Sequence, residues 1–166
     1  KYLFYTVCTE NWQGKTLCKI YQSRLVNDKW KYPEELAFGI NENGFTSTQP
    51  ALGLEDKRNR LILYFVSDRP GGKGGLDLYW TRFNKRDEEW SKPRNAGGKL
   101  NTKGDEETPW FDLKRGTLYF SSNGHPGIGG MDVFSSVGAK SSWSEPEILG
   151  VPINSTADDV YFRKQP

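Results

Sequence analysis

The sequence has few residues of the types that build metal and redox sites, and it has no long hydrophobic run. A single histidine among 166 residues excludes a zinc site with several histidine ligands. The 23 Lys and Arg residues nearly balance the 21 Asp and Glu residues, so the net charge of +2 does not favour nucleic acid or an anionic membrane as a partner. No apolar run reaches the roughly 20 residues that span a bilayer, and the first residues lack the pattern of a signal peptide. We therefore expect no nucleic-acid partner, no direct membrane insertion, no cofactor and no metal.

Glycine, proline and aromatic residues are abundant, and they recur in a repeated pattern. The chain has 18 Gly and 9 Pro, which indicate many turns. A Trp followed three residues later by Pro occurs three times, each time downstream of an apolar triplet and upstream of an apolar-Asn pair. The Trp residues are Trp30, Trp90 and Trp143, the triplets begin at Leu3, Leu63 and Leu118, and the asparagines are Asn41, Asn101 and Asn154. A period of roughly 55 to 60 residues made of short β-type runs is typical of propeller blades.

The second and third units also share a glycine-rich turn followed by an aspartate. Gly74-Gly75 precedes Asp77 by two residues, and Gly129-Gly130 stands in the same relation to Asp132. The first unit lacks this turn and places Leu17 where the aspartate is expected. It is therefore a degenerate copy of the repeat.

These features predict an all-β fold, a β-propeller with about three four-stranded antiparallel blades belonging to a larger ring, for which we expect six blades. In the third unit the strands are expected at 106–112, 117–122, 131–137 and around Trp143, with hairpin turns at 112–116 and, in the second unit, at 56–60. The predicted units are a partial blade at 1–45, complete blades at 46–104 and 105–157, and the first strand of a further blade at 158–166. The chain is thus expected to be cut within a blade at both ends.

The same unit alignment bears on the two cysteines, Cys8 and Cys18. Analogy with the other units places Cys18 opposite Tyr5 in a hairpin. An exported protein could still oxidise the pair, so a disulfide is open but not favoured.

Four motifs carry a resemblance to a known repeat. They are Leu-Tyr-Phe-Ser-Ser-Asn-Gly at 118–124, Gly-Gly-Met-Asp-Val-Phe at 129–134, Trp-Ser-Glu-Pro at 143–146 and Pro-Ile-Asn at 152–154. Over nearly the whole chain this pattern resembles the TolB-like, Pro-Asp type of β-propeller repeat, especially as found in OmpA-family envelope proteins of the Bacteroidetes. One group of these proteins belongs to the type IX secretion and gliding machinery. The turn at 112–116 departs from the usual Pro-Asp-Gly.

The resemblance implies a periplasmic, outer-membrane-associated protein of bacterial origin. It implies other envelope proteins as partners, with peptidoglycan bound only through domains outside this chain. On this basis we interpret the chain as a non-catalytic scaffold that binds proteins, and not as an enzyme. The alternatives are a glycan- or peptide-binding propeller and the propeller portion of a glycosidase or peptidase.

Asp77 and Asp132 are predicted to be structural acceptors in their turns, because a carboxylate beside a glycine-rich turn can accept several backbone N–H bonds. The alternative is a calcium ligand. Calcium takes about six or more oxygen ligands, and Asp68 together with Asp77 supplies too few.

An acidic group opens the first strand of each later blade. Asp105, Glu106 and Glu107 lie there in the third unit, and Asp158 and Asp159 occupy the matching positions of the next. We expect Asp105, Glu106, Asp158 and Asp159 to rim the channel of the ring. Paired carboxylates for glycoside hydrolysis are the alternative, which is weakened because no such pair stands at a unique, non-repeated place.

The remaining candidates are contacts to partners. His125, the only histidine, is expected on a turn facing solvent, where Arg69 stands in the preceding unit, and no Gly-x-Ser-x-Gly elbow accompanies it. Trp30, Trp90 and Trp143 recur in phase, so each is expected to pack between blades. The Trp residues that break phase, together with His125, are candidate partner contacts: Trp12, Trp80 and Trp110.

Overall fold

The structure is a computed structural model that describes residues 1–37, 39–55 and 60–164. All of its regular elements are β-strands, and they form three antiparallel sheets. Sheet 1 contains β1 (Tyr2–Glu10), β2 (Thr16–Val26), β3 (Lys29–Trp30) and β4 (Glu34–Glu35). Sheet 2 contains β5 (Ser47–Glu55), β6 (Arg60–Ser67), β7 (Asp77–Asn84), β8 (Glu89–Trp90) and β9 (Arg94–Asn95). Sheet 3 contains β10 (Glu106–Asp112), β11 (Thr117–Ser122), β12 (Asp132–Ala139), β13 (Ser142–Trp143) and β14 (Glu147–Ile148).

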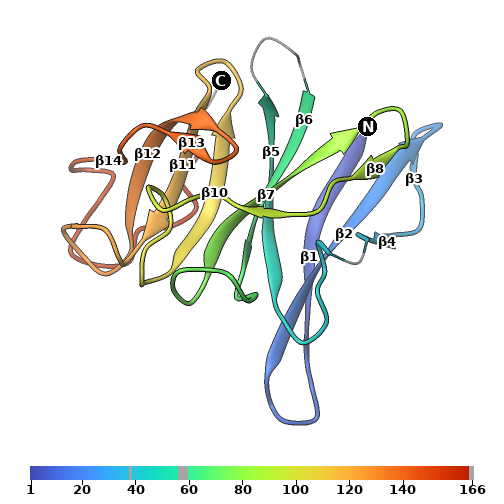
Figure 1. Ribbon diagram of the computed structural model, residues 1–166, viewed down its shortest axis with the longest axis horizontal. Coiled ribbons are helices and arrows are strands. Elements are labelled where there is room, and N and C mark those ends of the chain that lie inside the picture. Colours follow the sequence, from blue (N-terminus) through green and yellow to red (C-terminus); the bar gives the residue numbers. More distant parts are fainter. Residues whose placement is uncertain (38, 56–59, 165–166) are drawn as a thin grey trace.

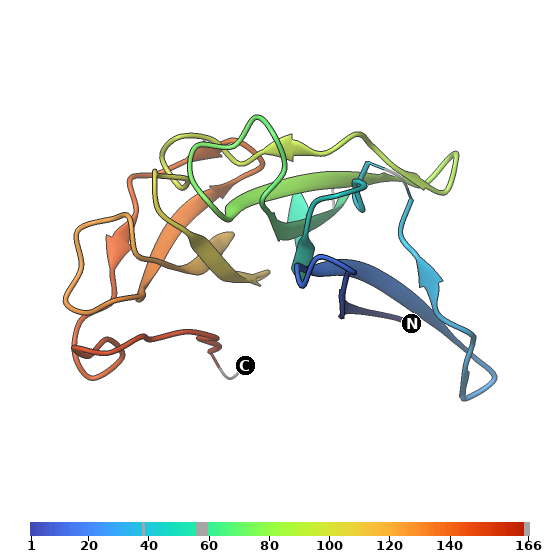
Figure 2. The same ribbon diagram turned by 90° about the horizontal axis from the view of Figure 1, so that it is seen from below.

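The three sheets stand side by side and follow an arc, with both termini on its inner side (Figures 1 and 2). Strands follow chain order from the inside outward in sheets 2 and 3, as β5-β6-β7-β8 and β10-β11-β12-β13. The outermost strand is broken into two short pieces, so β9 and β14 also pair with the third strand of their sheets. The Trp-Ser-x-Pro motif accounts for the break, because proline cannot donate to the ladder.

The sequence prediction agrees with the strands of the third unit, where 106–112 and 117–122 are the observed bounds of β10 and β11. The turn at 112–116 lies between these two strands. Most of the turn predicted at 56–60 lies outside the described residues.

The register within each sheet identifies equivalent residues. Tyr5 pairs with Tyr21, Phe65 with Tyr79 and Phe120 with Phe134, in the same place of sheets 1, 2 and 3. Counting from these pairs, Lys19 is the equivalent of Asp77 and Asp132. The assignment of Leu17 to that position is therefore wrong by two residues, because the first unit has a longer hairpin with a different turn.

The same shift overturns the prediction for the cysteines. Cys8 faces Cys18 across the ladder of β1 and β2, and the two form a disulfide with Cα atoms 4.0 Å apart. Tyr5 faces Tyr21 instead. The bridge staples the β1–β2 hairpin, which projects from the body of the molecule (Figure 1).

The repeated asparagines connect β2, β7 and β12 to the loop that follows the outermost strand of the same sheet. Asn41, Asn101 and Asn154 are all buried. Their side-chain oxygens accept the backbone N–H groups of Ile20, Leu78 and Val133, each at 2.8 Å, and their amide nitrogens donate to the carbonyl oxygens of the same three residues.

The core consists of two layers of apolar side chains, one between sheets 1 and 2 and one between sheets 2 and 3. Trp143 is buried and packs on Tyr64 of the preceding sheet with ring centroids 5.7 Å apart. Trp90 is half-buried and packs on Phe4 at 6.0 Å. Both therefore pack between sheets as predicted. For Trp30 the prediction is wrong: its side chain is 51% exposed, because no sheet of the described residues covers that face of sheet 1.

Residues 158–164 form no strand among the described residues, but the backbone of Tyr161 resembles that of one residue in each of β5 and β10. Tyr161 has φ 59°, close to the values of 51° at Gln49 and 50° at Thr108. In β5 and β10 these two residues lie within register shifts of the ladder. Tyr161 donates its N–H to Thr108 Oγ1 at 3.2 Å, as Thr108 donates to Gln49 Oε1 at 2.7 Å. Tyr161 thus matches Gln49 and Thr108 in backbone angle and in the position of its hydrogen bond.

Candidate functional site

Asp77 and Asp132 lie buried within the turns that precede them. Asp132 Oδ2 accepts the N–H groups of Ile128 at 2.8 Å and Gly129 at 2.9 Å, and Asp77 Oδ2 accepts the N–H of Lys73. Burial raises the pKa of Asp77, while the bonds from the backbone oppose that rise. A Cβ on Gly72 or Gly127 would lie 2.2 or 2.0 Å from the carboxylate oxygen, so the turns close tightly around these side chains.

The acidic group at the start of the inner strands is engaged with the chain itself. Asp105 accepts the N–H of Leu76 at 2.7 Å, and Asp158 accepts that of Met131 at 2.8 Å. Each carboxylate thereby links its segment of the chain to the preceding sheet.

Glu106 and Asp159 bind the loop just before them instead. Glu106 is fully buried and accepts bonds from the backbone and hydroxyl of Thr102 and from the hydroxyl of Ser122. Burial raises the pKa of Glu106 despite these bonds. Asp159 is half-buried and accepts the N–H of Ser155 at 2.6 Å.

The four candidate partner contacts differ in exposure. Trp12 is 90% exposed at the tip of the β1–β2 hairpin, and Trp110 is half-buried against Tyr119. Trp80 is only 7% exposed, so the expectation of an exposed contact is wrong: it fills the layer between sheets 2 and 3 and donates its indole N–H to Ser141 at 2.9 Å.

His125 is half-buried and does not face solvent as a turn residue would. Its ring packs on Phe120 and Phe134, and its Nε2 lies 2.8 Å from the carbonyl oxygen of Leu100. Arg69 makes the equivalent contacts in sheet 2, where it is 7% exposed and binds the carbonyl oxygen of Ile40. The sequence shows that the two positions correspond, but not that both side chains are buried or half-buried.

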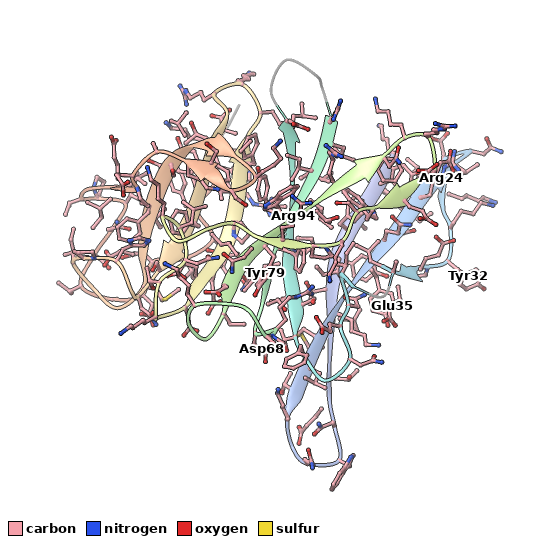
Figure 3. All side chains as sticks on the ribbon, viewed as in Figure 1. Arg24, Tyr32, Glu35, Asp68, Tyr79 and Arg94 are labelled. Atoms are coloured by element: carbon pink, nitrogen blue, oxygen red, sulfur yellow. A yellow bond between two sulfur atoms is a disulfide. The ribbon has the colours of Figure 1, made fainter. Side chains whose placement is uncertain are left out.

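A cavity of about 440 Å³ opens between sheets 1 and 2, and we call it the junction cavity. Its aromatic lining consists of Tyr2, Phe4, Tyr32, Phe83 and Trp90. Its polar lining consists of Gln22, Arg24, Lys31, Glu34 and Glu88. Figure 3 shows Arg24 on β2 and Tyr32 in the loop between β3 and β4. The rings of Phe4, Phe83 and Trp90 are half-buried, whereas the other two aromatic residues and the charged residues of the lining are exposed.

The junction cavity exists because one large side chain is missing. Phe4 pairs with Gln22 in sheet 1 as Tyr64 pairs with Trp80 in sheet 2, so Gln22 is the equivalent of Trp80. Trp80 fills the junction between sheets 2 and 3 and lies under Arg94, whose guanidinium carbon is 5.9 Å from the ring centroid. At the first junction the smaller Gln22 bonds Glu34 at 3.4 Å, and space remains.

We did not predict this cavity from the sequence. The signal was present, since Gln22 and Trp80 occupy the same repeat position. The assignment of Leu17 to the aspartate position is wrong by two residues. It concealed the correspondence, because it shifts β2 out of register with β7 and β12.

The junction cavity offers both surfaces that a polar ring-shaped ligand needs. Phe4, Phe83 and Trp90 supply apolar faces, with Phe83 and Trp90 in an edge arrangement at 5.2 Å between centroids. Gln22 and Arg24 supply donors, and Glu34 and Glu88 supply carboxylate acceptors. Its volume lies in the range of small-molecule sites.

Two other kinds of site are not found in the part of the chain that the structure describes. No group of three or more His, Cys, Asp or Glu side chains is placed to hold a metal ion there. Over the same residues, no helix is long and apolar enough to cross a membrane.

Comparison with known proteins connects the fold to solved structures. No known family matches the sequence, and no curated protein matches it either. Among solved structures, the chain is similar to an α-L-arabinofuranosidase from Fusarium graminearum, a mutant in complex with an iminosugar inhibitor. The TM-score is 0.57 and the identity 16%, over 89% of this chain and 45% of that one. A Hadza microbial sialidase gives a TM-score of 0.41 and 11% identity, over 87% and 43% of the two chains.

The chain thus spans about half the length of the structures it matches. The likeness to the arabinofuranosidase confirms the predicted all-β propeller fold. It also corrects the expectation that the chain is not an enzyme, because a similar arrangement of sheets occurs within an α-L-arabinofuranosidase. That expectation is withdrawn.

Proposed function

We propose that this chain is part of a β-propeller that acts on carbohydrate and binds a saccharide in the junction cavity. The observation that carries this proposal is the combination of half-buried aromatic rings with amide, guanidinium and carboxylate groups in one cavity of about 440 Å³. A pyranose or furanose ring has apolar C–H faces and a rim of hydroxyl groups. Phe4 and Trp90 would stack on its faces, and Gln22, Arg24 and Glu34 would bind its hydroxyls.

The likeness in fold to the arabinofuranosidase supports carbohydrate as the ligand class. Glycoside hydrolysis in most families needs two carboxylates flanking the scissile bond. Glu34 and Glu88 are the carboxylates at the junction cavity, so they are the residues to test for cleavage.

The cellular setting remains part of the proposal. The repeat pattern supports a place among bacterial envelope proteins in the periplasm, and the disulfide between Cys8 and Cys18 supports an oxidising compartment. Partners among envelope proteins are proposed on the same ground.

The sharpest test fills the cavity with the side chain that the next junction already contains. In Gln22→Trp, the indole should fill the junction between sheets 1 and 2, just as Trp80 fills the junction between sheets 2 and 3. We expect wild-type protein to bind neutral arabino- or xylo-oligosaccharides in titration calorimetry, and Gln22→Trp to bind them at least tenfold more weakly. Trp12→Ala is the control, because it removes an exposed Trp far from the junction cavity and should change nothing.

Two outcomes would count against the proposal. If no neutral oligosaccharide binds at millimolar concentration, the ligand class is wrong. If Gln22→Trp binds as tightly as wild type while folding normally, the site lies elsewhere. Hydrolysis of aryl arabinosides that survives in the double variant Glu34→Gln/Glu88→Gln would rule out these two residues as the catalytic pair.

A further inference from the structure

A second cavity, of about 530 Å³, lies at sheet 3, and we call it the basic cavity. It is lined by the turn between β10 and β11, by the end of β10 and by residues 163–164. Its polar residues include four cations, Lys114, Arg115, Arg163 and Lys164, and one carboxylate, Asp112. It shares no residue with the junction cavity.

The single carboxylate of the basic cavity is already engaged. Asp112 Oδ1 accepts the backbone N–H groups of Lys114 at 2.9 Å and Arg115 at 3.1 Å, and the Arg115 guanidinium lies 3.5 Å from Oδ2. Asp112 therefore fixes the turn and offsets only the charge of Arg115.

The other three cations have no acidic partner. Within the described residues, Lys114, Arg163 and Lys164 take part in no ion pair, and all three are exposed. Uncompensated charges of one sign around a concave surface raise the local potential and attract a counter-ion. Because the net charge of the chain is only +2, this potential is a local property of the basic cavity.

An aromatic wall stands beside the cations. Trp110 packs on Tyr119 at 5.3 Å and on Phe162 at 6.3 Å between ring centroids, which holds its half-buried indole in place. Lys164 Nζ lies 5.8 Å from the Tyr119 ring centroid, so the ammonium group is positioned by the same cluster. An apolar ring face and several cations thus line one cavity.

We infer that the basic cavity binds an acidic saccharide, in which the cations pair with the carboxylate or sulfate group and Trp110 stacks on the sugar ring. This inference rests on the proposed function, which supplies carbohydrate as the ligand class. The junction cavity, with cations and carboxylates in similar number, would bind neutral sugar residues of the saccharide. The basic cavity would bind its charged sugar residues. A free inorganic anion would satisfy the cations but would leave the Trp110 face unused.

The experiment measures how tightly the intact protein chain binds three oligosaccharides of equal length. They are an oligogalacturonide, a sulfated oligosaccharide and a neutral oligosaccharide. The variant is Lys114→Gln/Lys164→Gln. The matched control, Lys29→Gln/Lys103→Gln, removes two exposed lysines that line neither cavity. We expect the variant to lose at least tenfold in affinity for one or both acidic probes and nothing for the neutral probe. The control should bind as wild type, and acidic binding should weaken as salt rises. The oligogalacturonide and sulfated arms distinguish a carboxylate from a sulfate ligand.

Several results would overturn the inference. Acidic binding that persists in Lys114→Gln/Lys164→Gln places the ligand elsewhere, and acidic binding lost in Gln22→Trp places it in the junction cavity. Equal binding of inorganic phosphate or of a short single-stranded DNA would show an unspecific anion site. If the proposed function is wrong, the neutral oligosaccharide does not bind, whatever the acidic probes do at the basic cavity. Thermal unfolding of each variant shows whether it is folded.

Discussion

Asn101 shows how single side chains hold this fold together. It is fully buried, accepts the N–H of Leu78 at 2.8 Å and donates to the carbonyl oxygen of Leu78 at 2.9 Å and to Asn95 Oδ1 at 2.8 Å. Asn101→Ala should leave the N–H of Leu78 buried without a partner, whereas the carbonyl oxygen of Leu78 keeps the bond from the Ala96 N–H at 2.9 Å. We expect the free energy of unfolding in urea to fall by about 1–3 kcal/mol.

The control for this prediction is Asn43→Ala, at an exposed asparagine two residues after the equivalent Asn41. It should cost less than about 0.5 kcal/mol. Equal losses in the two variants would show that the repeated asparagine does not carry the strand–loop bonds. The sequence revealed the spacing of these asparagines, but not their bonds, because the spacing alone does not say which backbone groups lack partners.

At the scale of elements, prediction succeeded where each unit follows the repeat. The bounds of β10 and β11 agree with expectation because the turns on either side carry clear signals. It failed in the first unit, where a longer hairpin replaces the glycine-rich turn and the Asp position falls on Lys19. Both the disulfide and the junction cavity depend on that register, so both were missed. The basic cavity was missed for another reason. Its lining combines the turn after β10 with residues 163–164, which lie about fifty positions further along the sequence.

Glu55, at the end of β5, connects sheets 2 and 3 and gives a prediction about pH. Its side chain is 12% exposed, accepts a bond from Lys140 of sheet 3 at 2.5 Å, and lies 4.0 Å from Arg60 and 3.9 Å from Arg82. The bond from Lys140 lowers the pKa of Glu55 below 4.5, with the charges of Lys140, Arg60 and Arg82 helping and burial opposing. The stabilisation is therefore fully present above pH 4.5 and lost as the pH falls through the lowered pKa.

We expect Glu55→Gln to unfold about 1 kcal/mol more easily than wild type at pH 7. The difference between the two proteins should vanish in acid. Urea unfolding of both proteins from pH 7 to pH 3 measures it. The control Glu35→Gln breaks an exposed pair with Lys19 and should cost little at any pH. A difference between Glu55→Gln and wild type that stays constant down to pH 3 would refute the electrostatic account.

Across the whole molecule, stability depends on sheets that cover one another. The sequence predicted this arrangement from strands that are apolar on both faces, such as β6, in which six of eight residues are buried. What it could not predict was which equivalent residues end up covered. Trp30 and Trp143 occupy the same repeat position, yet one is 51% exposed and the other 6%, because only Trp143 has a preceding sheet to pack on.

This contrast gives a test of the stacked architecture. Trp143 packs on Tyr64 at 5.7 Å and donates its indole N–H to the carbonyl oxygen of Lys140 at 2.9 Å. Trp143→Ala would open a cavity between sheets 2 and 3, and we expect a loss of about 3–5 kcal/mol in the free energy of unfolding. Trp30→Ala removes the same side chain from an open face and should cost under about 1 kcal/mol. Urea unfolding followed by far-UV circular dichroism measures both. Similar losses in the two variants would contradict this account, because they would mean that Trp30 is buried in solution against a surface outside the described residues.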